Sequence, residues 1–151
     1  MNKLSSLTII LISIFILGCT SKAPKDLGLS KTTQRFKPCP DKKNCVSSFE
    51  KPDSDFYIAP IKTNIPKEEI KVKIKKIVEN MPRATLIEET EDYLRYEFES
   101  AIFRFVDDVE LSFALPDQVH FRSASRTGYS DLGVNRKRVV NIKFQFNQNQ
   151  Y

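Results

Sequence analysis

A basic stretch near the C-terminal end, residues 122–138, holds the side chains best suited to binding. It contains five Arg or Lys residues, one acid and two of the chain's four glycines. Guanidinium groups bind carboxylate or phosphate through paired hydrogen bonds, and loop amides around glycines add donors. The stretch therefore predicts a site for an anionic small molecule, lipid head group, glycan or protein segment. With nearby upstream residues, the predicted ligand-binding set is Arg104, Asp107, Asp108, Arg122, Ser123, Ser125, Arg126, Tyr129, Asp131, Asn135 and Arg136.

An internal network of ion pairs is the alternative use of the same cations. In that arrangement the arginines of the stretch would neutralise Asp107, Asp108 and Asp131. The two interpretations differ in what a substitution does. Removing an arginine from a buried ion pair destabilises the fold, because it leaves an uncompensated charge, whereas removing one from a ligand site leaves the fold stable.

A hydrolase using Asp107, Asp108 or His120 is the second functional hypothesis. Two carboxylates act as acid and base only if their environments differ and a cleft receives the substrate. His120, the sole histidine, would need a nucleophile and an orienting acid, for which Ser112 and Glu110 are the nearby candidates. The sequence has no Gly-x-Ser-x-Gly, Walker or dinucleotide-binding motif, and it offers too few ligands for a metal site. We therefore favour a non-enzymatic module without metal or cofactor.

Two alternating segments must position these residues as neighbouring strands. Along residues 102–115 apolar side chains share one phase of the alternation and polar side chains share the other. Phe103 and Phe105 belong to the apolar phase, which predicts that they face the core. Asp107 falls in the same phase. Either a bulge at Asp107 and Asp108 turns it outward, or it points inward and pairs with a cation or backbone donors.

The turn at residues 115–117 sets the register between the two strands. A three-residue loop keeps apolar residues opposite apolar ones along residues 118–126, and a two-residue loop does not. The odd loop pairs Ser112 with His120 and Glu110 with Arg122, and it places Asp108 diagonally between two arginines. The predicted polar face gathers Arg104, Asp108, Glu110, His120, Arg122 and Arg126.

The remaining elements predict an α+β fold. Residues 66–80 carry one apolar stripe at helical spacing, residues 84–89 and 93–100 read as a hairpin, and residues 56–61 read as a first strand. Local signals for residues 136–146 are divided between a strand and a helix for which Asn135 is the N-cap. We expect an antiparallel sheet of four to five strands, with the central-sequence helix and a C-terminal helix on one face.

The N-terminal segment indicates an address in the cell envelope. Lys3 is followed by an apolar run over residues 7–17 that is too short to span a bilayer comfortably. The run ends in Ile16-Leu17-Gly18-Cys19, which resembles the bacterial lipobox. We expect a signal peptide over residues 1–18, a lipid anchor on Cys19, and a flexible tether over residues 19–35. Thr20 in place of Asp favours the outer membrane, facing the periplasm, over the inner membrane.

The partners and the cysteines follow from that address. The expected partners are the membrane, through Cys19, and an anionic ligand or envelope protein; no basic run is dense enough for nucleic acid. With Cys19 lipidated, Cys39 and Cys45 are the remaining pair. Outside the cytoplasm this pair predicts a structural disulfide. A redox-active pair and free thiols are the alternatives.

Three motifs occur in the order found in one known family: Cys39-Pro40 with Asn44-Cys45-Val46-Ser47-Ser48, the run of residues 103–110, and the run of residues 122–136 that contains Gly128 and Gly133. On these motifs the chain resembles the bacterial and plant family catalogued as domain of unknown function number 1499, over about residues 36–146. The resemblance implies an α+β domain with a C-terminal helix after Asn135, and no established activity. We expect one domain over residues 36–147 and a frayed tail at 148–151.

Overall fold

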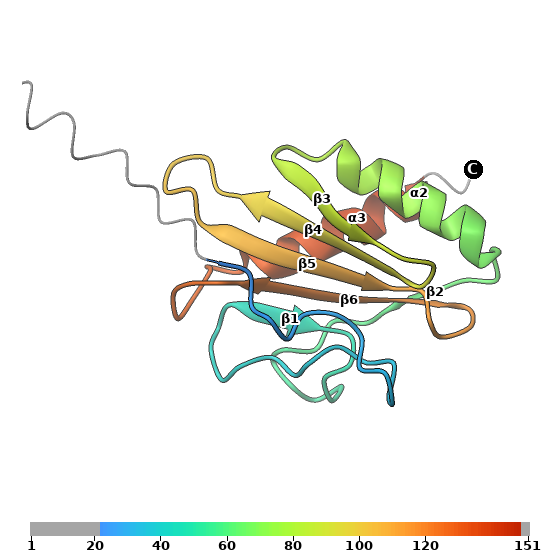
Figure 1. The fold of residues 1–151 in the computed structure, drawn as a ribbon, viewed down its shortest axis with the longest axis horizontal. Helices are drawn as coiled ribbons and strands as arrows, with labels where there is room; N and C mark the ends of the chain where they lie inside the picture. Colours follow the sequence, from blue (N-terminus) through green and yellow to red (C-terminus); the bar gives the residue numbers. More distant parts are fainter. Residues whose placement is uncertain (1–21, 149–151) are drawn as a thin grey trace, which may run out of the picture.

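The computed structural model describes residues 22–148, which form an antiparallel sheet with two helices on one face (Figure 1). The strands run in the order β1-β6-β5-β4-β3, and β2 also pairs with β6. In chain order the elements are β1 (Cys45–Ser47), β2 (Ile61–Lys62), α2 (Lys67–Glu79), β3 (Ala84–Glu89), β4 (Tyr93–Glu99), β5 (Val106–Ser112), β6 (Gln118–Ser125) and α3 (Val134–Gln148). The α+β class is confirmed. The described sheet has six strands instead of four or five, because β1 and β2 are too short to show a periodic pattern.

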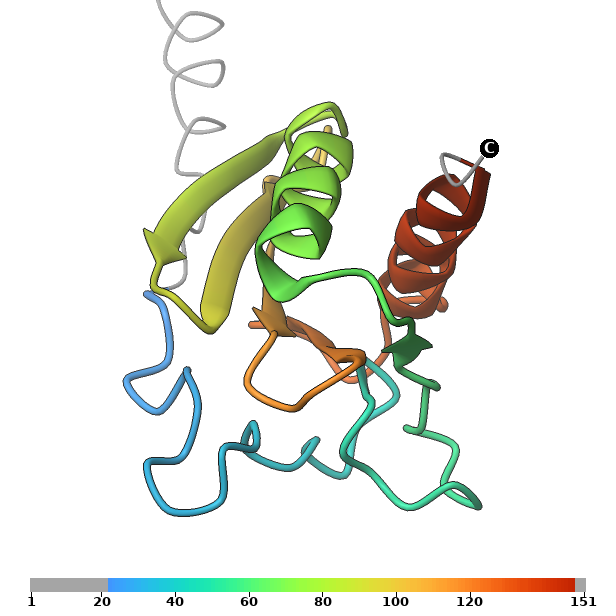
Figure 2. The same cartoon turned by 90° about the vertical axis from the view of Figure 1, so that its right-hand side faces the viewer.

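Both helices bury one apolar stripe against the same face of the sheet (Figure 2). Helix α2 begins after Pro66, carries Glu68 and Glu69 in its first turn, and buries Ile70, Ile74, Ile77 and Val78. Helix α3 buries Val139, Ile142 and Phe146, so residues 136–146 are helical as the family resemblance implied. The same core takes up buried side chains from the three long central strands, among them Leu94, Tyr96, Val109, Leu111 and Phe121.

The start of α3 differs from the prediction that Asn135 caps it. The helix begins at Val134, and the carboxylate of Asp131 accepts the backbone N–H groups of Gly133 (2.9 Å) and Asn135 (2.7 Å). An acidic acceptor in this place satisfies N–H groups that have no partner within the helix. The prediction that Asn135 is the N-cap is therefore wrong: Asn135 lies inside the helix, its side chain is buried, and its backbone N–H donates to Asp131.

The predicted register between β5 and β6 is confirmed. Ser112 lies opposite His120 and Glu110 lies opposite Arg122. The pairing of β5 with β4 is continuous from residue 106 to residue 112, so there is no bulge at Asp107 and Asp108. Asp107 therefore points to the helix side, the second of the two predicted alternatives.

The predicted long strand over residues 102–115 is wrong at its start. Strand β5 begins at Val106, and residues 100–105 form a loop whose Ile102, Phe103 and Phe105 are exposed instead of packed in the core. Arg104 has a φ of 54°, which interrupts the extended path. The loop is closed by Ser100, whose N–H donates to the Phe105 carbonyl (2.8 Å) and whose hydroxyl accepts the Phe105 N–H (2.9 Å).

The predicted strand at residues 56–61 is also wrong over most of its length. Only Tyr57 forms an isolated bridge, to Ser47, and the ladder with β6 starts at Ile61. Pro60 has no N–H to donate, so a continuous ladder through it is not possible.

The segment before β1, residues 22–38, runs beside the second face of the sheet, opposite the helices. Phe36 is buried, with its ring 5.3 Å from that of Phe49 and 6.4 Å from that of Tyr93. The Gly28 N–H donates to Glu110 Oε1 (2.7 Å). This path differs from the flexible tether expected for residues 19–35.

The predicted signal peptide and the lipid anchor on Cys19 lie outside the described residues. Within residues 22–148, neither helix has the length and apolar character needed to cross a bilayer. At the other end α3 continues to Gln148, one residue past the predicted end of the domain.

Cys39 and Cys45 form the predicted structural disulfide. The bond closes a short loop immediately before β1, the edge strand that pairs with residues 122–124 of β6. We predict that the Cys39→Ser/Cys45→Ser variant loses about 2 kcal/mol in the free energy of unfolding in urea, because a loop of this length restricts the unfolded chain by that amount. Reductant should cost the wild type the same stability and the variant none. An equal effect of reductant on both proteins would contradict this role.

Candidate functional site

The structure divides the predicted ligand-binding residues into three groups and leaves Arg104 apart. Asp108, Arg122 and Arg126 lie on the sheet face that is turned away from the helices. Asp107, Ser123, Ser125 and Asn135 lie where α3 packs on the sheet, and Tyr129, Asp131 and Arg136 lie at a cleft next to the disulfide. Arg104 is in the exposed loop before β5 and pairs with Glu99 (2.8 Å).

Arg126 is held by carboxylates on the sheet face. Its Nε and one terminal nitrogen donate to the two oxygens of Asp108, both at 2.7 Å, and it also pairs with Glu97. The Arg126 and Asp108 side chains are only 6% and 2% exposed. Their hydrogen bonds raise the pKa of the Arg126 guanidinium. Paired, buried geometry of this kind stabilises charges that would otherwise be costly to bury.

Arg122 is also engaged internally. It donates to Glu110 Oε2 (2.9 Å), and the second oxygen of Glu110 accepts the Tyr93 hydroxyl (2.9 Å) and the Gly28 N–H. Burial, together with the charge of Glu110, raises the pKa of the Tyr93 phenol, which therefore remains a hydrogen-bond donor. Arg122 and Arg126 thus form the internal ion-pair network that was the alternative to a ligand site.

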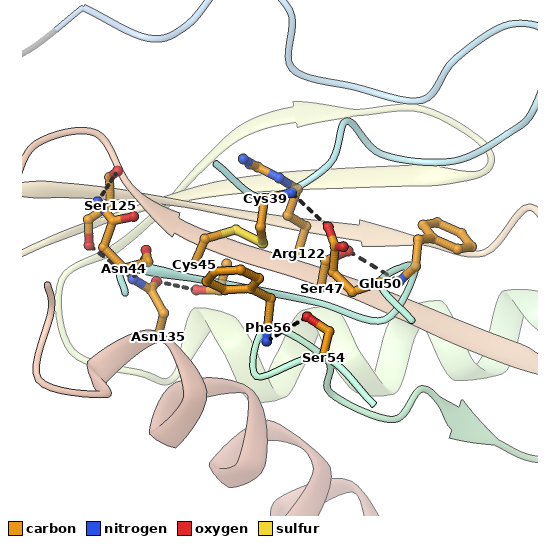
Figure 3. The surroundings of a disulfide bond; sticks show 12 residues. Cys39, Asn44, Cys45, Ser47, Glu50, Ser54, Phe56, Arg122, Ser125 and Asn135 are labelled. Carbon is orange, nitrogen blue, oxygen red and sulfur yellow. Dashed lines mark hydrogen bonds between the residues drawn. A yellow bond between two sulfur atoms is a disulfide. The ribbon is translucent and has the colours of Figure 1, made fainter. Parts of the chain in front are cut away.

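The second group joins α3 to the sheet and to the loop before β1. Asn135 is 1% exposed; its amide nitrogen donates to the Asn44 carbonyl (3.1 Å) and to Ser125 Oγ (2.9 Å), and its oxygen accepts Ser123 Oγ (2.5 Å). Figure 3 shows Asn44, Ser125 and Asn135 meeting in this way. Nearby, Asp107 pairs with Arg138 (2.7 Å). These contacts assign the group a structural role.

The hydrolase hypothesis requires residues that the structure keeps apart. Asp107 and Asp108 point to opposite faces of β5, and each is paired with an arginine. His120 lies opposite Ser112, but its ring stacks on Phe49 at 4.1 Å and its Nε2 contacts Gln118 Oε1 (3.1 Å). Burial, with a contribution from Arg35, lowers the pKa of His120 to about 4. Neither arrangement supplies an acid and a base facing one cleft.

The third group lies at a cleft of about 630 Å³ beside the disulfide. Its floor includes Cys45, Val46 and Phe56, and Figure 3 shows Phe56 close to the Cys39–Cys45 bond. Its walls come from the disulfide loop and from the turn before α3. The lining residues with polar or exposed side chains are Asp41, Lys42, Lys43, Asp55, Tyr129, Ser130, Asp131, Leu132 and Arg136.

The cations of this cleft differ from those of the sheet face. Lys42 and Lys43 are exposed, and neither side chain has a hydrogen bond or ion pair within the described part of the chain. Arg136 donates to the main-chain carbonyls of Tyr57 (2.9 Å) and Asp55 (2.5 Å), so its position is fixed without a carboxylate partner. Within residues 22–148, its charge is therefore not neutralised by an ion pair.

Among residues 22–148, no three His, Cys, Asp or Glu side chains gather closely enough to hold a metal ion.

The family model described as "Protein of unknown function (DUF1499)" matches residues 35–146. The chain belongs to this family. Among curated proteins, none matches the chain.

Several important residues of this DUF1499 domain were not in the predicted set. Arg138 was detectable, since it lies three residues after Asn135 and therefore on the same side of a helix. Parity placed Glu110 on the polar face but outside the predicted ligand-binding set, and in the structure its buried carboxylate accepts a hydrogen bond from Arg122. Lys42 and Lys43 carry no sequence signal that separates them from other surface lysines. Only the disulfide loop and the turn before α3, meeting in space, bring them to Arg136.

We predict that Arg126→Gln lowers the free energy of unfolding by about 3 kcal/mol, because it removes two hydrogen bonds to buried Asp108 and leaves this carboxylate the longer ion pair with Arg95 (3.6 Å). Arg104→Gln is the matched control, since its pair with Glu99 is exposed, and it should cost less than about 1 kcal/mol. Urea unfolding of both variants measures the difference. Equal stability of the two variants would show that the Arg126 pair does not hold the sheet face.

The environment of His120 predicts a pH dependence. Its folded pKa of about 4 lies below the ordinary value of 6.5, so the unfolded chain takes up a proton first as the pH falls. Stability should therefore fall between about pH 6.5 and 4, by up to about 3 kcal/mol from this group. His120→Gln should show a shallower fall over that range in urea titrations. An identical pH profile for the wild type and the variant would refute this assignment.

Proposed function

We propose that this protein is a non-enzymatic module of the bacterial cell envelope, anchored by a lipid on Cys19, that binds an anionic ligand in the cleft beside the disulfide. The observation that carries the proposal is a set of three cations at one cleft that have no carboxylate partner in the described part of the chain, namely Lys42, Lys43 and Arg136. The arginines of the sheet face are already neutralised, so they do not compete with this assignment. The proposed ligand site therefore includes Tyr129, Asp131 and Arg136 of the predicted set, and it excludes the arginines of the sheet face.

The lining of the cleft favours a ligand that combines an anionic group, hydroxyl or ammonium groups, and some apolar surface. Lys42, Lys43 and Arg136 supply charged donors for a phosphate or carboxylate. Asp41 and Asp55 also line the cleft, so hydroxyl or ammonium groups of the same ligand would find acceptors. Tyr129 and Leu132 are 63% and 85% exposed at its edge and offer apolar contact. This combination suits a lipid head group or a small phosphorylated or carboxylated molecule.

The surrounding structure supports a preformed site. The disulfide fixes the loop that carries the two lysines, and Asp131 fixes the turn before α3 through two backbone N–H groups. A site whose walls are held in this way loses little conformational entropy when it binds. The lipobox-like sequence before Cys19 and the pair of cysteines that have formed a disulfide support the envelope location, with the outer membrane favoured by Thr20.

The test is titration of the full-length protein, in detergent, with three probes: inorganic phosphate, glycerol phosphate and phosphoethanolamine. Backbone amide shifts in NMR spectra should change at residues 42–43 and 130–133. Lys42→Gln/Lys43→Gln should weaken binding by at least about tenfold, because the loss of even one charged hydrogen bond costs about that much affinity. Tighter binding of the two head-group analogues than of inorganic phosphate would indicate a lipid source, and equal binding would indicate free phosphate.

Lys31→Gln/Lys51→Gln is the matched control, because it removes the same charge from exposed positions that do not line the cleft. It should leave the affinity for all three probes unchanged. Equal weakening in both double variants, or amide shifts scattered over the whole surface, would show that binding reflects net charge and would overturn the proposed site.

A further inference from the structure

Two loops that leave the sheet at the same end carry exposed apolar side chains. The first is the loop of residues 100–105 between β4 and β5, and the second is the segment of residues 126–133 between β6 and α3. They emerge together because β5 and β6 are antiparallel neighbours, with Asp107 opposite Ser125, and because the Arg126 N–H donates to the Val106 carbonyl (3.1 Å). We call Ile102, Phe103, Phe105 and Leu132 the apolar tip.

The apolar tip is more exposed than isolated surface hydrophobic residues require. Leu132 and Ile102, at 85% and 81%, are the two most exposed large hydrophobic residues among those described, and Phe103 is 67% exposed. The rings of Phe103 and Phe105 stack at 5.6 Å, so the first loop presents a contiguous surface. Single exposed hydrophobic residues are ordinary, but a cluster of them marks an interaction surface.

The first loop is held in an outward conformation. Arg104 adopts a positive φ of 54° and pairs with Glu99 (2.8 Å), while the two hydrogen bonds between Ser100 and Phe105 close the loop. Because the backbone is fixed, its apolar side chains do not fold back onto the core. Exposed apolar side chains on a fixed backbone are suited to insertion into an apolar environment.

The start of the described chain lies at the same end of the domain (Figure 1). Pro24, Asp26 and Leu27 line one cleft together with Ser125 and Arg126, the residues where β6 ends. The sequence has 21 residues before Lys22, where the described chain begins, and they include the apolar run of residues 7–17 and Cys19. Since three residues span at most about 10 Å, a lipid on Cys19 would hold the bilayer close to Lys22 and therefore to the apolar tip.

We propose that the apolar tip inserts into the interfacial layer of the lipid bilayer. Phenylalanine and leucine side chains enter this layer, and nearby cations favour anionic head groups. Arg83 and Lys137, both exposed, lie around a cleft that also borders Ser100 and Ala101 of the first loop. The orientation of the domain rests on the proposed lipid anchor, whereas insertion itself rests on the exposed loop.

The test uses the full-length protein, with its disulfide intact, in vesicles of phosphatidylethanolamine and phosphatidylglycerol. Phe103→Trp places an environment-sensitive fluorophore in the first loop of a chain that has no tryptophan of its own, and it does not depend on the state of Cys19. The control is Glu91→Trp, in the exposed β3–β4 turn at the opposite end of the strands. On reconstitution the emission from position 103 should shift to the blue and be quenched by brominated lipids. The emission from position 91 should remain that of a probe in water and be quenched by iodide.

Iodide quenching of position 103 as strong as that of position 91 would overturn the insertion. Mass spectrometry of the same sample keeps this result separate from the proposed anchor. A probe in lipid with an unmodified Cys19 would support insertion and overturn the anchor, and a probe in water with a lipidated Cys19 would do the reverse. Because Phe103 and Glu91 are both exposed, both tryptophan variants should have the melting temperature of the wild type, which shows that the comparison is made on folded protein.

Discussion

The buried carboxylate of Glu110 is the charge on which the second face of the sheet depends. It is fully buried, and an isolated carboxylate in that position would be prohibitively costly. Three donors from three separate segments meet it: Arg122 from β6, Tyr93 from the start of β4, and the Gly28 N–H from the N-terminal segment. Satisfying this one group therefore requires that the hairpin, the neighbouring strand and the N-terminal segment assemble together.

The same balance of charge explains why the polar residues of the sheet are unsuited to chemistry. Asp108 and Glu110 face one way and Asp107 faces the other, because successive residues of a strand alternate. Each of these carboxylates is already engaged by an arginine, so no pair of them is left to share a substrate. The proposed ligand site lies instead where loops meet, at the cleft beside the disulfide, because the cations there are held by main-chain carbonyls or are unpaired in the described structure.

Parity of the side chains made much of this arrangement predictable. The pairing of Glu110 with Arg122 and the buried stripe of α2 follow from periods of two or about four residues. For Asp107 parity left two directions open, and the continuous pairing of β4 with β5 selects the inward one. The partner of Asp107 was not predictable in the same way, because Arg138 reaches it only when α3 has packed on the sheet. Arg104 shows a second reason why prediction failed. A positive φ at an arginine has no signature in the sequence, so the alternation of apolar and polar residues continues through residues 102–105, which form a loop.

The contact at Gly28 sets how far the domain can travel from its proposed anchor. Counting from Cys19, only nine residues (28 − 19) precede the point where the chain is fixed to the sheet. A fully extended chain of that length reaches about 30 Å. Even with its apolar tip out of the bilayer, the domain would stay within a thin shell above its own membrane, and the opposite side of the periplasm would lie beyond its reach. A ligand of the cleft would then have to come from that membrane or diffuse into the shell.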